Sequence, residues 1–118
     1  MKNKREHLRV SVGLPVEIYD VLNDRNIVGR ITDISSGGVS MITREELSLD
    51  TPVALTFRFE EIFYKRLSAD VVRETKKGEN SYLGIAFFNL PERDRAQLEK
   101  LVKNIYIKKE RGVRKGIL

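Results

Sequence analysis

The feature that most constrains this fold is a succession of short segments in which apolar and polar side chains alternate. The first runs from Val12 to Tyr19, and the others cover residues 26–32, 39–43, 53–59, 67–71 and 82–88. A period of two residues is typical of strands with one buried and one exposed face. Because no long helical segment separates these six strands, the pattern predicts an antiparallel barrel or sandwich.

Turn-forming residues separate the predicted strands. Asn23-Asp24 follows the first strand, Ser35-Ser36-Gly37-Gly38 joins the second to the third, and residues 76–80 form a predicted hairpin loop before the last. Pro15 has no amide hydrogen, which places the first strand at a sheet edge or places Pro15 near the strand's beginning.

After Pro91 the apolar residues recur at helical spacing, which predicts one amphipathic helix. Its predicted inner face and its terminal charges are Leu98, Leu101, Val102 and Ile105, with Glu92 and Asp94 early and Lys108 and Lys109 late. These charges complement the helix dipole. Beyond Glu110 we expect a frayed basic tail, because glycine lowers helix stability. The chain therefore divides into an N-terminal segment (1–11), a barrel with its helix (12–110) and the tail (111–118).

Composition limits the classes of protein that remain. A chain of 118 residues with 41% hydrophobic content fits one domain with a real core. It has no cysteine, so disulfide, thiolate and zinc–sulfur chemistry are excluded. No apolar stretch approaches the roughly 20 residues of a membrane helix, and we expect a cytoplasmic protein. The net charge of +5 favours anionic partners.

Two polar segments are not needed to build a core. The first is Arg5-Glu6-His7-Leu8-Arg9, ahead of the first strand, and the second is Asp33-Ile34-Ser35-Ser36-Gly37-Gly38. In an extended chain Arg5 and Arg9 would lie roughly 13 Å apart, far enough to hold opposite sides of one ligand. Guanidinium groups bind phosphate and the O6/N7 edge of guanine. The Asp33 carboxylate accepts from guanine N–H groups, and glycines let backbone amides approach phosphate. Together these groups predict a nucleotide pocket.

Simpler interpretations of the same residues remain open at this point. The two arginines can belong to a solvated tail, and the second segment can be turn chemistry, with Asp33 capping an amide and Gly37 or Gly38 at positive φ. His7 is the single histidine, so no metal site or general base is predicted. The aromatics Phe57, Phe59, Phe87 and Phe88 are assigned to the core, and Tyr19, Tyr64, Tyr82 and Tyr106 receive no ligand-binding role.

The order of these motifs resembles that of the PilZ domain, a family of bacterial receptors for cyclic di-GMP. The resemblance rests on Arg-x-x-x-Arg before the first strand and Asp-x-Ser-x-x-Gly after the second. The segment 82–87, Tyr-Leu-Gly-Ile-Ala-Phe, is similar to the family's final barrel strand, and the helix after Pro91 is similar to its C-terminal helix. The resemblance covers nearly the whole chain and implies a six-stranded antiparallel β-barrel with a C-terminal α-helix.

The resemblance also implies roles for individual residues. Arg5 and Arg9 would contact the phosphates and guanines, and Asp33, Ser35 and Gly38 would form the opposing rim of the pocket. Gly37, within the same motif, is assigned a mainly structural role. Lys4 precedes the first motif arginine, the position that influences whether one ligand or a stacked pair is bound. Arg73, at the end of the fifth predicted strand, would offer its guanidinium to a guanine face.

The sequence therefore predicts a cyclic di-GMP receptor that changes conformation on binding and regulates an unidentified protein partner in motility, biofilm formation or a related process. No further cofactor is expected. A ligand-independent protein-interaction module is the first alternative, and a nucleic-acid-binding barrel ranks below it. An enzyme is not expected, because no nucleophile is paired with a base and no carboxylate pair is placed for acid–base chemistry.

Overall fold

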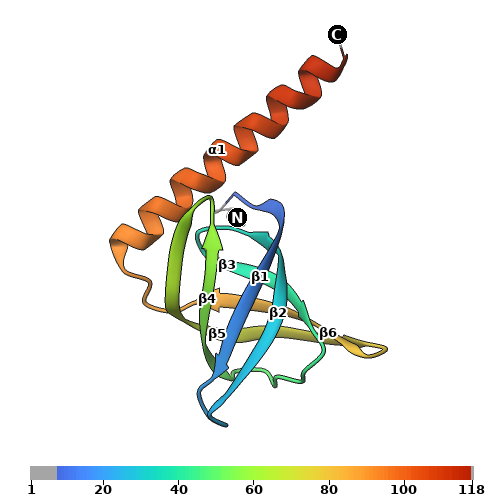
Figure 1. Cartoon of the computed structure of the whole chain (residues 1–118), viewed down its shortest axis with the longest axis vertical. Helices are drawn as coiled ribbons and strands as arrows, with labels where there is room; N and C mark the ends of the chain where they lie inside the picture. The colour runs from blue at the N-terminus through green and yellow to red at the C-terminus, as the bar shows by residue number, and fades with distance from the viewer. Residues whose placement is uncertain (1–7, 118) are drawn as a thin grey trace, which may run out of the picture.

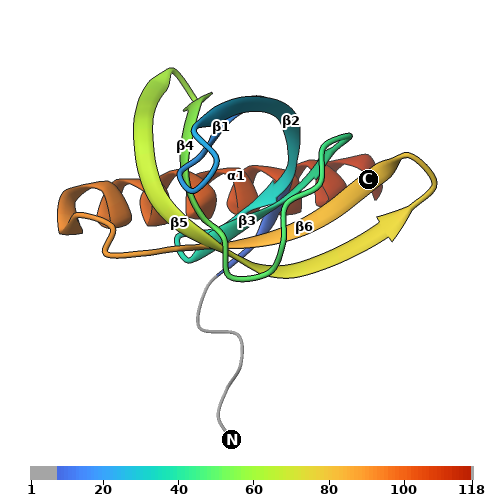
Figure 2. The same cartoon turned by 90° about the horizontal axis from the view of Figure 1, so that it is seen from below.

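The computed structural model describes residues 8–117, with side chains described for residues 8–110. The elements are β1 (Val10–Asp20), β2 (Arg25–Ile34), β3 (Gly38–Thr43), β4 (Pro52–Phe59), β5 (Ile62–Lys77), β6 (Asn80–Phe87) and α1 (Glu92–Ile117). The strands close into a barrel in the order β1-β2-β3-β6-β5-β4, and every neighbouring pair is antiparallel. Figures 1 and 2 show the barrel with α1 across one end. The predicted architecture is confirmed.

The core is built by the alternation that the sequence displays. On β1, Val16 and Ile18 are buried while Glu17 is exposed, and on β5 the buried residues are Leu67, Ala69 and Val71. Burying a valine, leucine or isoleucine side chain stabilises a fold by about 1.5–3 kcal/mol. Leu47, in the loop between β3 and β4, is also buried and belongs to the same cluster.

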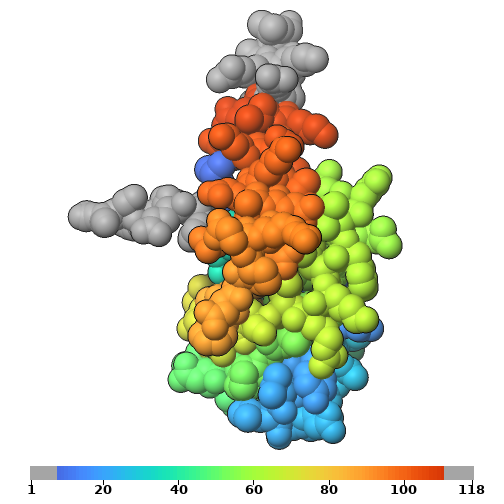
Figure 3. All heavy atoms as spheres, turned by 90° about the vertical axis from the view of Figure 1, so that its left-hand side faces the viewer, coloured from blue at the N-terminus to red at the C-terminus, as the bar shows by residue number. Residues whose placement is uncertain are grey.

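The helix covers the barrel with the face that the sequence predicts. Leu98 and Val102 are buried, and Leu101 and Ile105 pack partly buried against the core. Figure 3 shows α1 against the part of the surface formed by β5. The Tyr64 hydroxyl of β5 donates to Gln97 Oε1 at 3.0 Å, which fixes the first half of the helix. Farther along, the helix extends away from the barrel (Figure 1).

Several predicted boundaries are wrong by a few residues, and β5 is much longer than the predicted segment. The predicted loop at 76–80 shortens to a turn of Gly78 and Glu79, because Lys77 and Asn80 already pair. Val10 and Ser11 belong to β1 and not to a separate segment. Phe88 lies beyond β6 and is exposed, so its assignment to the core is wrong.

The C-terminal end of α1 also differs from the prediction. The backbone is helical to Ile117, so Gly112 and Gly116 do not end it near residue 110. Glycine lowers helix propensity by about 1 kcal/mol but does not forbid helical dihedrals. Lys108 and Lys109 therefore lie inside the helix and not in its last turn. Although α1 is long, no described helix is apolar enough over a sufficient length to cross a bilayer.

Pro15 lies where the barrel tolerates it. β1 pairs with β4 only from Glu17 to Asp20, so at Pro15 one side of β1 faces no strand. On the other side Pro15 is opposite Arg30 of β2. The missing amide hydrogen therefore removes nothing from the β1–β4 pairing.

Candidate ligand-binding cleft

A cleft of about 790 Å³ opens where the start of β1, the β2–β3 turn, β5, β6 and α1 come together. This volume is within the range of small-molecule sites, roughly 300–1,000 Å³. The residues that line it are Leu8, Arg9, Ser35, Gly37, Gly38, Val39, Ser40, Val72, Arg73, Gly84, Ile85, Ala86 and Tyr106. Both arginines in this set are exposed. The cleft therefore presents two guanidinium groups on a surface that is otherwise neutral.

The β2–β3 turn forms one rim of the cleft and is held by the Ser35 hydroxyl. Ser35 Oγ donates to the Gly38 carbonyl at 3.3 Å and accepts from the Gly37 amide at 3.1 Å, and the Ser35 amide donates to the same Gly38 carbonyl at 2.9 Å. Neither Gly37 nor Gly38 has a positive φ. Among the described residues, Gly78 is the one glycine with that backbone conformation. The expectation of positive φ in this turn is wrong.

Gly38 is required for a different reason. A Cβ atom added there would lie 2.1 Å from the Ile85 carbonyl oxygen of β6. Gly38 pairs with Ala86 and begins the β3–β6 ladder. Any larger residue would push β3 away from β6, so the closeness of these two strands depends on the glycine.

Arg9 reaches the rim from the start of β1. Its Nη1 forms an ion pair with Asp33 Oδ1 at 2.5 Å and lies 3.5 Å from Ser40 Oγ. The Arg9 side chain is 55% exposed and that of Asp33 is 27% exposed. An exposed pair of this kind contributes about 0–1 kcal/mol. An incoming anion can therefore take the place of Asp33 on Arg9 at little cost in stability.

Arg73 reaches the cleft from β5 through a β-bulge. Strict alternation after Leu67, Ala69 and Val71 would turn Arg73 into the core, but the register with β6 shifts between Val71 and Arg73. Arg73 is consequently exposed, and its guanidinium carbon lies 2.7 Å from where a Cβ of Gly84 would be. The guanidinium thus lies over the glycine, inside β5 and not at its end as predicted.

The structure brings most of the predicted residues together. Arg9, Ser35, Gly37, Gly38 and Arg73 line one cleft, and Asp33 touches it through Arg9. The predictions for Lys4, Arg5 and His7 lie outside the described residues. Sequence reasoning missed Tyr106 of α1 and Ser40 of β3, although Ser40 is two residues beyond the Gly38 motif position. Within residues 8–110 no group of three or more His, Cys, Asp or Glu is placed to hold a metal.

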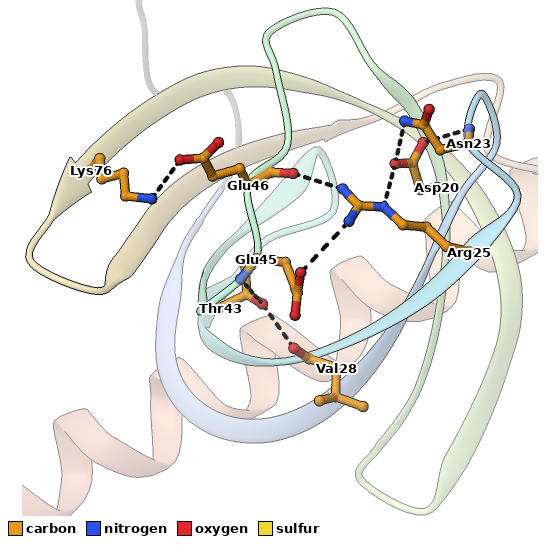
Figure 4. Close-up of polar contacts among 8 residues, drawn as sticks. All are labelled: Asp20, Asn23, Arg25, Val28, Thr43, Glu45, Glu46 and Lys76. Carbon is orange, nitrogen blue, oxygen red and sulfur yellow. Dashed lines mark hydrogen bonds and ion pairs between the residues drawn. The ribbon is translucent and has the colours of Figure 1, made fainter.

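The opposite end of β1 carries a second charged cluster (Figure 4). Asp20 is fully buried and accepts from the Asn23 amide at 3.3 Å, Asn23 Nδ2 at 2.9 Å and Arg25 Nε at 3.0 Å. Arg25 also donates to the Glu46 carbonyl at 2.9 Å and pairs with Glu45 at 3.6 Å. Lys76 pairs with the Glu46 carboxylate at 2.6 Å. These contacts join the β1–β2 turn to the β3–β4 loop, and that loop to the end of β5.

Comparison with known families identifies the fold. The PilZ domain model matches residues 3–104. The chain belongs to the PilZ domain family. This match spans the whole barrel and the first half of α1, including both polar segments that the sequence singled out. Comparison with curated protein sequences found no match.

Solved PilZ structures share this fold at low sequence identity. The Bacillus subtilis inhibitor of motility (MotI/DgrA) superposes with a TM-score of 0.77 at 20% identity over 92% of this chain and 54% of that one. Escherichia coli YcgR in complex with c-di-GMP superposes with a TM-score of 0.79 at 15% identity, over 96% of this chain and 50% of that one. The PilZ domain of Escherichia coli YcgR with c-di-GMP superposes with a TM-score of 0.71 at 15% identity, over 96% of this chain and 99% of that one. The chain spans about half the length of the first two proteins.

Proposed function

We propose that this PilZ domain is a cyclic di-GMP receptor that binds its ligand in the cleft without chemical turnover. The observation that carries the proposal is the convergence of Arg9, the Ser35–Gly38 turn and Arg73 on one cleft of about 790 Å³. The two arginines come from the start of β1 and from β5, and both are exposed and not part of the core. The YcgR structures with c-di-GMP support the choice of ligand, because they share this fold.

The chemistry of the cleft suits a ligand with two phosphates and two guanines. Each guanidinium can fork onto a phosphate or onto a guanine O6/N7 edge, or stack on a base. Arg9 would exchange Asp33 for a phosphate, and the released carboxylate could then accept from a guanine N–H. In this proposal Arg5 and Lys4 act from the N-terminal side, and Ser35, Gly37 and Gly38 hold the rim in shape.

The receptor would act on a partner protein that the sequence does not name. The similarity of the fold to an inhibitor of motility supports a role in motility, biofilm formation or a related process. A ligand that draws Arg9 away from Asp33 would change the surface at the start of β1, and a partner could recognise that change.

The test is isothermal titration of the purified chain with cyclic di-GMP, alongside GTP and cyclic di-AMP. We expect selective heat for cyclic di-GMP, and we expect Arg9→Ala to weaken binding about 10- to 100-fold, because a hydrogen bond to a charged group contributes about 1.5–3 kcal/mol. Arg58→Ala is the matched control, since Arg58 is an exposed arginine of β4 that does not line the cleft.

Each result separates the candidate functions. Equal losses in Arg9→Ala and Arg58→Ala would mean that net charge, and not the cleft, holds the ligand. Absence of heat from folded wild-type chain would reject the receptor and favour the ligand-independent interaction module. Affinity for oligonucleotides that falls steeply with salt and is unchanged by Asp33→Ala would favour the nucleic-acid-binding barrel.

A further inference from the structure

Tyr106 lies in the wall of the cleft that α1 provides. It lines the main cleft together with Arg9 and Arg73, and it also lines an adjoining hollow of about 310 Å³ with Arg9 and Ser11. Tyr106 therefore stands beside Arg9 at the boundary between the barrel and the helix. It is the one aromatic residue among the described residues that line the cleft.

The position of Tyr106 is fixed by the same stretch of helix. Lys109, three residues later on α1, donates from Nζ to the Ser11 carbonyl of β1 at 2.9 Å. On the other side of Tyr106, Val102 is buried in the core and Ile105 is partly buried. This part of α1 is thus anchored to the barrel on both sides of Tyr106, which keeps the backbone that bears the ring beside the cleft.

The ring of Tyr106 is also unused within the described part of the chain. The Arg66 guanidinium lies 4.9 Å from the centroid of the Tyr19 ring, and Lys77 Nζ lies 5.6 Å from the centroid of the Tyr82 ring. The Tyr64 ring packs against Phe57. Among the described residues, Tyr106 has no such cation or ring partner and its hydroxyl has no hydrogen bond. It remains 42% exposed. An exposed aromatic face beside a guanidinium-lined cleft is a stacking surface for a purine base.

We propose that Tyr106 stacks on one guanine of the ligand and makes α1 part of the binding site. This inference rests on the proposed function and assigns to the helix a contact that neither sequence motif supplies. Base–aromatic stacking contributes without reading hydrogen bonds, so Tyr106 adds affinity for purines in general, while selectivity for guanine stays with the arginines and Asp33.

The test compares Tyr106 with its helix neighbour. Ile107 is 37% exposed and does not line the cleft, so it is the matched control. We expect Tyr106→Ala to weaken cyclic di-GMP binding about 5- to 100-fold by titration calorimetry. Tyr106→Phe should retain the affinity, and Ile107→Ala should not change it. Circular dichroism melting checks that each variant is folded.

A second readout uses the absence of tryptophan from the chain. Tyr106→Trp and Ile107→Trp each contain a single tryptophan, whose emission can be excited selectively over that of the tyrosines. Emission of Tyr106→Trp should be quenched when cyclic di-GMP stacks on the indole, whereas that of Ile107→Trp should stay nearly constant.

The outcomes separate the two proposals. If wild-type chain binds and Tyr106→Ala binds equally well, the stacking role is rejected and the receptor function stands. If Tyr106→Phe loses as much affinity as Tyr106→Ala, the hydroxyl and not the ring makes the contact, which also rejects stacking. If wild-type chain binds no cyclic di-GMP, both proposals fail together.

Discussion

An arginine meets an aspartate at each end of β1, and the two pairs differ in almost every physical respect. Asp20, at the turn end, is buried and accepts three hydrogen bonds, one of them from Arg25. Asp33 at the cleft end is partly exposed and pairs with an Arg9 side chain that is itself 55% exposed. The residue types are the same, so burial and the number of donors decide which pair holds the fold and which is available to a ligand.

The largest expected effect is at the turn end. Asp20→Ala removes the acceptor for Arg25 and for the Asn23 amide, and we expect the free energy of unfolding to fall by about 3 kcal/mol. Urea denaturation at neutral pH measures this loss. Affinity for cyclic di-GMP should be unchanged in the fraction that remains folded. A loss below about 1 kcal/mol would mean that the Asp20 pair contributes no more to stability than the exposed Arg9–Asp33 pair, which would contradict the comparison.

Acid provides an independent check of the same carboxylate. Burial raises the pKa of Asp20, but the hydrogen bonds from Asn23 and Arg25 outweigh it and hold the pKa below the ordinary value of 3.8. A depressed pKa gives stability that is present above about pH 4 and is lost as the pH falls through the folded-state pKa. The difference in stability between wild type and Asp20→Ala should therefore shrink in acid.

The next effect is at the cleft end and should appear in binding alone. Arg73→Ala should weaken cyclic di-GMP binding about tenfold, equivalent to about 1.4 kcal/mol, because it removes a guanidinium from the cleft. Unfolding should be almost unaffected, since Arg73 is exposed. Gly84→Ala sharpens the test by displacing the guanidinium without removing its charge. If Gly84→Ala binds cyclic di-GMP normally while Arg73→Ala does not, binding depends on the charge of Arg73 and not on the position of its guanidinium over Gly84.

The smallest effect concerns the exposed pair itself. Asp33→Ala should lower the free energy of unfolding by less than about 1 kcal/mol, because the exposed Arg9 guanidinium can be hydrated by solvent when its partner is removed. Urea denaturation beside Asp20→Ala makes the comparison direct. A loss from Asp33→Ala as large as that from Asp20→Ala would show that the cleft end also holds the fold together.

The fold could be predicted because alternation is a local signal. Val16, Ile18, Leu67, Ala69 and Val71 face the core as their period requires. Strand ends were less accurate, since pairing across the barrel extends β5 well past its last alternating residue. The helix end was missed because propensity alone does not decide where a helix stops.

The motifs predicted some of the residues that line the cleft, but not all of them. Arg9, Ser35, Gly37, Gly38 and Arg73 meet as expected, but periodicity alone would have buried Arg73, and only the β-bulge turns it outward. Tyr106 could not be found from spacing, because a helix residue far from both motifs enters the cleft through tertiary packing alone. The Ser35 hydroxyl, and not glycine flexibility, accounts for the turn.

The unpaired stretch of β1 has a consequence for the behaviour of concentrated protein. Between Val10 and Val16 one side of this strand pairs with no other strand, and such open edges recruit strands from other molecules. Pro15 offers no amide there, and Lys109 occupies the Ser11 carbonyl while bringing a positive charge to the same edge. We therefore expect this gap in strand pairing to resist edge-to-edge aggregation, with α1 limiting self-association as well as lining the cleft.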